Sequence, residues 1–71
     1  MDNAQDITAA IKNGRTLYIK THTRTTKIDA RTVAKFEAAG VPVLKTGKDG
    51  HLYVAEGRRY VDTHYANVSL V

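Results

Sequence analysis

Apolar and polar residues recur with helical spacing in two stretches of the chain. Ile7 and Ile11 lie one turn apart, and Gly14 follows in the place of a left-handed cap, so a short helix is predicted over 3–12. The stripe of apolar residues on this helix is narrow. The helix therefore needs to pack against the rest of the chain to persist.

A second helix is predicted over 30–39. Asp29 is a suitable N-cap, and the residues that follow are mostly good helix formers, with Val33 and Phe36 on one side. Gly40 can end the helix, and Pro42 cannot continue it. These start and stop signals make this helix better defined than the first.

Alternating apolar and polar residues predict strands in the remaining segments. The longest covers 15–23, and for 24–28 a strand and a mobile loop both fit the threonine-rich sequence, with a loop favoured over 24–27. Shorter strands are expected at 41–46, 51–55 and 58–62, separated by turns rich in glycine, and a further terminal strand at 67–71 is left open.

This pattern predicts an α+β fold in a single domain over residues 1–71. Successive strands joined by tight turns favour antiparallel pairing, so we expect one antiparallel sheet of three to five strands. Two short helices would pack on one face of it, in the order α-β-α-β-β-β, because one sheet covered by helices buries a single core. The 71 residues contain no cysteine that could form a disulfide, and a homodimer would add to the buried core.

The last hairpin has an expected register. A turn centred on Glu56 and Gly57 would place Tyr53 directly opposite Tyr60. Arg58 would then share the face of the two tyrosines. The same arrangement is typical of ordinary sheet-stabilising tyrosine pairs.

Positive charge is concentrated in the first half of the chain. The formal net charge is +4, and residues 12–35 hold one acidic residue among their Lys and Arg side chains. In a continuous strand over 15–23, alternate side chains would gather on one face. The predicted binding residues are this strand face with its nearest bases and the hairpin residues: Tyr18, Lys20, His22, Arg24, Lys27, Arg31, Tyr53, Arg58 and Tyr60.

Such a surface suits an anionic partner. The first hypothesis is a non-enzymatic nucleic-acid-binding protein that neutralises phosphates and stacks bases on tyrosine. The alternative is a small interaction module or inhibitor, of the kind made by phages and mobile elements. It would cover an acidic surface of a larger nucleic-acid-processing or host-defence complex.

Other functional classes have weaker signals. The three histidines, His22, His51 and His64, show no recognised metal-ligand spacing, so neither a metal nor a cofactor is predicted. No activated nucleophile beside a base is evident, and the prediction is that the protein is not an enzyme. Without a long apolar run or a signal peptide, no membrane association and a cytoplasmic location are expected.

Overall fold

The computed structural model describes residues 3–71 and contains two helices and six strands in the order α-β-β-α-β-β-β-β. The elements are α1 (Asn3–Lys12), β1 (Leu17–Lys20), β2 (Thr25–Ile28), α2 (Ala30–Ala38), β3 (Leu44–Thr46), β4 (Leu52–Glu56), β5 (Arg59–Asp62) and β6 (Asn67–Leu70). The predicted α+β class is confirmed, with two short helices and antiparallel pairing throughout.

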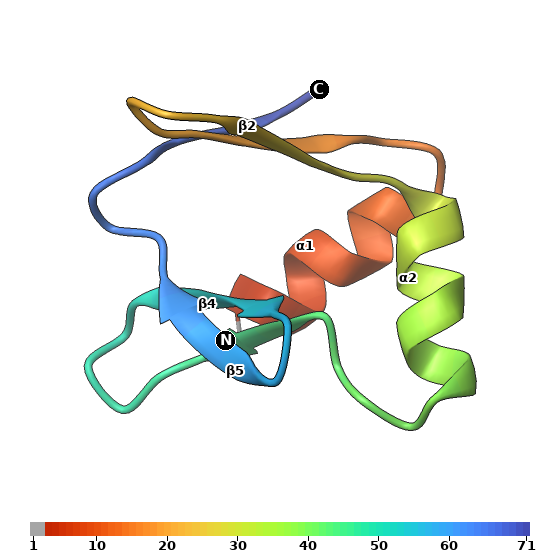
Figure 1. The fold of residues 1–71 in the computed structure, drawn as a ribbon. Helices are drawn as coiled ribbons and strands as arrows, with labels where there is room; N and C mark the ends of the chain where they lie inside the picture. The colour runs from red at the N-terminus through yellow and green to blue at the C-terminus, as the bar shows by residue number, and fades with distance from the viewer. Residues whose placement is uncertain (1–2) are drawn as a thin grey trace.

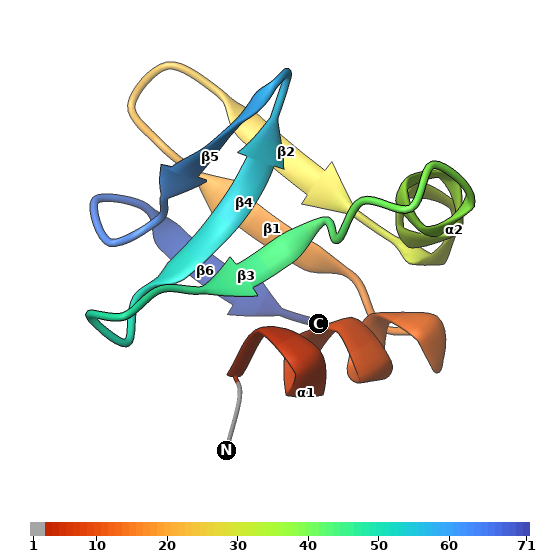
Figure 2. The ribbon, with the colours of Figure 1, turned by 90° about the horizontal axis from the view of Figure 1, so that it is seen from below.

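The strands form two three-stranded sheets, with the orders β2-β1-β6 and β3-β4-β5. Figure 1 shows the first sheet at the top of the molecule and the second at the bottom, with α1 between their levels and α2 beside it. Seen along the perpendicular direction, the strands of one sheet run across those of the other (Figure 2). The last strand, β6, returns to pair with β1, so the first and last strands of the chain lie in one sheet.

One apolar cluster joins both sheets and both helices. It contains the buried residues of each element, namely Ala4, Ile11, Leu17, Ile19, Ile28, Val33, Val43, Leu44 and Val54. Leu17 lies at its centre, with no exposed surface, between Ile28 of β2 and Leu70 of β6. Because both sheets turn their apolar faces to this cluster, their polar faces point away from each other.

Local signals place the helices where the sequence predicts them. Gly14 follows α1 with a φ of 107°, a value that glycine adopts readily. At the start of α2, Asp29 Oδ1 accepts hydrogen bonds from the backbone N–H and the hydroxyl of Thr32, both at 3.1 Å. The backbone hydrogen bond is the main cause of a pKa of Asp29 below its usual value of 3.8.

The first predicted strand is wrong in its length. β1 ends at Lys20, and the chain turns back through residues 21–24 into β2, where the threonines pair with β1. The turn is closed by the Thr21 N–H, which donates to the Arg24 carbonyl at 2.8 Å, and by the Thr21 hydroxyl at 3.2 Å from the same oxygen. Residues 25–28 are therefore strand, contrary to the favoured loop.

The predicted hairpin register is also wrong. The turn is formed by Gly57 and Arg58, so Glu56 lies opposite Arg59 and Ala55 opposite Tyr60. Tyr53 consequently pairs with Asp62 instead of Tyr60. The change equals two residues, so each strand residue keeps its predicted face, while Arg58 leaves the strand for the turn.

Both helices are short, and neither is long and apolar enough to span a membrane within residues 3–71.

Candidate nucleic-acid interface

The outer face of the sheet β2-β1-β6 brings together residues that are separated in the sequence. Tyr18 lies between Lys27 of β2 and Ser69 of β6, and Lys20 lies between Thr25 and Asn67. Opposed residues of neighbouring strands share a face, and this face points away from the core. We call these six residues the basic sheet face: Tyr18, Lys20, Thr25, Lys27, Asn67 and Ser69.

The basic sheet face is accessible and carries only positive formal charge. Tyr18 is half-buried, and the other five residues are exposed. Lys20 and Lys27 are its two cations, and the six residues include no acid. A tyrosine ring flanked by ammonium groups offers a stacking surface next to phosphate-binding charges.

A shallow cleft extends this surface beyond the strand ends. It has a volume of about 300 Å³ and is lined by Lys20, Thr21, His22, Tyr65 and Asn67. Tyr65 is 88% exposed, more than any other exposed large hydrophobic residue in the described part of the chain. Its ring lies against the His64 ring, with centroids 3.7 Å apart, and the exposed part of the ring, beside Lys20 and Asn67 in the cleft, can stack on an unpaired base.

Tyr65 is not among the predicted binding residues, because it lies in the connection between β5 and β6, outside any alternating segment. The only signal available was a large aromatic residue in a polar turn. His22, one of the predicted binding residues, lies in the turn after β1 and not in a strand. It is exposed and lines the cleft.

Arg24 occupies a different position from the one predicted. Its guanidinium forms an ion pair with the carboxylate of Glu56 at the end of β4. The pair connects the tip of the β1–β2 hairpin to the opposite sheet. Arg24 therefore has an acidic partner within the chain and does not continue the basic sheet face.

The hairpin tyrosines lie on the other sheet, whose outer face points in the opposite direction (Figure 1). Tyr60 donates a hydrogen bond to the Pro42 carbonyl at 2.6 Å, and the Lys45 ammonium lies 4.2 Å from its ring centroid. Tyr53 donates to Asp49 at 2.9 Å, a hydrogen bond that raises the pKa of the tyrosine. The hydroxyl groups of both tyrosines therefore already have hydrogen-bond partners within the chain.

The remaining predicted residues are dispersed. Arg58 is exposed in the β4–β5 turn, and Arg31 is exposed in the first turn of α2. Neither belongs to the paired positions of the sheet β2-β1-β6. The structure thus brings together Tyr18, Lys20 and Lys27, with His22 at their edge, and separates the others from them.

No protein-family model, curated protein or solved structure matched this chain in the comparisons made.

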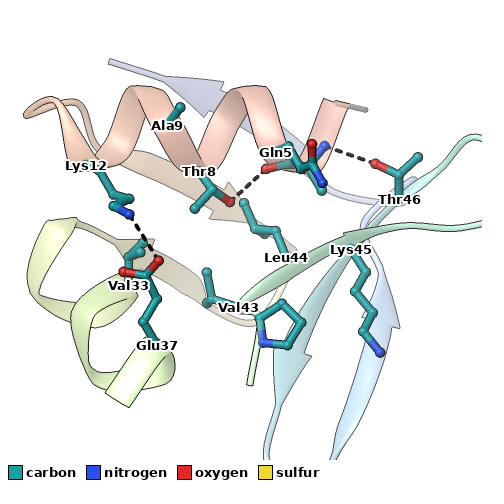
Figure 3. Close-up of a pocket in the computed structure, with 12 residues that line it drawn as sticks. Gln5, Thr8, Ala9, Lys12, Val33, Glu37, Val43, Leu44, Lys45 and Thr46 are labelled. Carbon is teal, nitrogen blue, oxygen red and sulfur yellow. Dashed lines mark hydrogen bonds and ion pairs between the residues drawn. The ribbon is translucent and has the colours of Figure 1, made fainter. Parts of the chain in front are cut away.

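A separate pocket of about 470 Å³ lies between α1, α2 and β3 (Figure 3). Polar groups around it pair with one another: Lys12 Nζ lies 3.1 Å from Glu37 Oε2, and Thr46 Oγ1 accepts from the Ala4 N–H at 2.9 Å. The apolar side chains between them, Val43 and Leu44, belong to the core. This pocket is a groove between the helices and β3, and the Lys12, Glu37 and Thr46 side chains that line it are already paired within the chain.

Two histidines and a carboxylate meet at the far end of the β4–β5 hairpin. His51 Nδ1 lies 2.8 Å and His64 Nδ1 lies 3.0 Å from the same oxygen of Asp62, Oδ2. The hydrogen bond to Asp62 is the main cause of a raised pKa of His51. Partial burial works to raise the pKa of Asp62, but hydrogen bonds from His51 and His64 outweigh it and keep this pKa below its usual value.

Proposed function

We propose that the protein binds single-stranded nucleic acid on the basic sheet face, without enzymatic activity and with little sequence selectivity. The observation that supports this most directly is the cross-strand position of Tyr18 beside Lys27, with Lys20 two residues along the same strand. Stacking on tyrosine tolerates any base, and lysine interacts with phosphate as a point charge.

The two outer faces of the molecule differ in charge in a way that favours the basic sheet face. On the sheet β3-β4-β5, Asp62 lies on the outer face beside Tyr53, and Asp49 is bonded to the same tyrosine. These two carboxylates outnumber Lys45, the cation that lies opposite Tyr53 on the same face, and would repel a phosphate backbone. The opposite sheet presents Lys20 and Lys27 without a neighbouring acid among its paired positions.

Extension of the surface to Tyr65 supports a single strand as the ligand. Its ring is exposed at the edge of the cleft, where Lys20 and Asn67 also line the wall. Two tyrosines separated by lysine would allow consecutive unpaired bases to stack while phosphates lie along the ammonium groups. A duplex keeps its bases stacked internally and offers no such contact.

Fluorescence anisotropy with a short labelled oligonucleotide tests the proposal. Single-stranded DNA or RNA should bind more tightly than a duplex of the same length, and affinity should fall steeply as salt rises. Lys20→Glu and Lys27→Glu should each weaken binding by roughly tenfold, by loss of one charge-assisted phosphate contact.

Lys48→Glu is the matched control, because it makes the same charge change in the exposed turn before β4. If this substitution weakens binding as much as the other two, the protein has only a diffuse attraction for polyanions. If no nucleic acid binds even at low salt, the basic sheet face is better explained as a contact for an acidic protein.

A further inference from the structure

The β4–β5 hairpin and the segment after it bring two histidines to one carboxylate. Asp62 is the last residue of β5, His51 immediately precedes β4, and His64 lies in the turn after β5. The Thr63 N–H donates to the Leu52 carbonyl at 3.0 Å, which extends the pairing of the two strands by one step. The backbone of the hairpin thus fixes all three positions.

The distances within this cluster are close to those of a metal site. One potential ligand atom from each of His51, Asp62 and His64 lies within 4.8 Å of the others. Metal-to-ligand bonds of about 2.0–2.1 Å in a tetrahedral site separate the ligand atoms by roughly 3.3 Å. The N···O separations of 2.8 and 3.0 Å are slightly shorter than that spacing, and every pair of ligand atoms lies within 4.8 Å, so side-chain rotations can bring all three to it.

We propose that His51, Asp62 and His64 bind a divalent transition-metal ion of the zinc class. Imidazole nitrogen and carboxylate oxygen together suit zinc and its neighbours, whereas magnesium and calcium prefer oxygen ligands alone. Both histidines would ligate through Nδ1 and carry their proton on Nε2. A water molecule would complete the coordination, since both histidines are exposed to solvent.

Hydrogen bonds around the ligands hold them in place before a metal arrives. The second carboxylate oxygen of Asp62, Oδ1, accepts from the His64 N–H at 3.0 Å. Asp49 Oδ1 accepts from the His51 N–H at the same distance. The rings of His51 and His64 stack with centroids 5.1 Å apart, which keeps the two nitrogen ligands side by side.

The test titrates zinc ions, with no other ligand, into the full chain. The chain carries no tag and is treated with a chelator beforehand to remove bound metal. Calorimetry should show saturable binding near one ion per chain. Nitrogen-15 spectra of the histidine rings should show Nδ1 shifts for His51 and His64, with His22 unmoved. His64→Gln and Asp62→Asn should each weaken zinc binding by at least about tenfold, and His22→Gln should leave it unchanged.

Two results would overturn the site. One is the absence of zinc-dependent heat and ring shifts up to about 1 mM, the range of very weak association. The other is binding that survives the double substitution His51→Gln and His64→Gln in a folded protein. Asp62 also supports the turn, so amide spectra must show that Asp62→Asn is folded. If it is not, the exposed His64 variant and the wild-type ring shifts decide the question.

Discussion

Tyr18 of β1 lies directly opposite Lys27 of β2 on the solvent side of the sheet β2-β1-β6. The two residues are joined by a hairpin whose turn covers 21–24. The sequence predicts a row of basic side chains along one strand. The pairing of β1 with β2 instead forms a compact basic surface that is two strands wide. The proposed interface depends on it, because a base stacked on the tyrosine would place its phosphate near the lysine.

Tyr18→Leu should weaken single-strand binding by roughly 5- to 150-fold, because loss of one stacking contact costs about 1–3 kcal/mol. The leucine keeps an apolar side chain on the half-buried position and should leave the fold intact. Anisotropy titrations at fixed salt give the change in affinity directly.

Lys27→Ala should change how strongly the affinity for single-stranded nucleic acid depends on salt. Loss of one phosphate contact should reduce the slope of log affinity against log salt by about 0.7 on a single strand. Lys48→Ala serves as its control. A slope that Lys27→Ala leaves unchanged would remove this lysine from the interface, whatever the effect on absolute affinity.

Tyr65→Ala and Tyr60→Ala should separate binding from stability. Tyr65 is almost fully exposed, so its loss should weaken nucleic-acid binding with little change in melting temperature. Tyr60 bonds to the Pro42 carbonyl and lies under Lys45, contacts that contribute about 1–2 kcal/mol together. Its loss should lower the melting temperature by roughly 4–16 °C and leave binding intact. Equal effects of the two substitutions on affinity would contradict the proposal that nucleic acid binds on the basic sheet face and not on the sheet β3-β4-β5.

The helices and the fold class could be predicted from the sequence because their signals are local. Asp29 before α2 and Gly14 after α1 act on backbone groups within a few residues of themselves. The turn at 21–24 could not be predicted in this way. Threonine favours extended backbone, while the turn is held by hydrogen bonds between Thr21 and Arg24 that depend on the pairing of the strands beside it.

The predicted register of the β4–β5 hairpin was wrong because a glycine does not by itself fix its position within a turn. Gly57 has a φ of 66° and stands first in a two-residue turn, although glycine can stand at either central position of such turns. With glycine in the second position of the turn, Tyr53 would pair with Tyr60, whereas in the structure it pairs with Asp62. The predicted faces survived because the error was two residues, an even number in a strand.

The candidate sites were the hardest features to predict, because each is assembled by pairing between strands. Lys27 joins Tyr18 only through the β1–β2 register, and His51 meets Asp62 only through the β4–β5 register. Neither contact has a characteristic sequence spacing. The separation of the candidate tyrosines onto two sheets likewise follows from the return of β6 to β1, which no local pattern indicates.

The ion pair between Arg24 and Glu56 should contribute little to stability and should limit the role of Arg24 in binding. Both side chains are substantially exposed, and such surface pairs contribute about 0–1 kcal/mol. Arg24→Glu should therefore weaken nucleic-acid binding less than Lys20→Glu does. In thermal melts, exchange of the charges in Arg24→Glu with Glu56→Arg should restore most of the stability lost in either single variant.

Asp29 should make α2 sensitive to acid. Its pKa is lowered in the folded chain, mainly by the Thr32 N–H, so its contribution to stability is fully present above the unfolded-state value near 3.8. That contribution is lost as the pH falls through the lower folded-state pKa. Asp29→Asn can still accept the Thr32 hydrogen bond and should reduce the slope of melting temperature against pH below about pH 4. Asp29→Ala should lower the melting temperature by several degrees at neutral pH through loss of the cap, and by less at low pH. Melting curves of the three proteins across this range test the assignment, and identical slopes for the wild type and Asp29→Asn would contradict it.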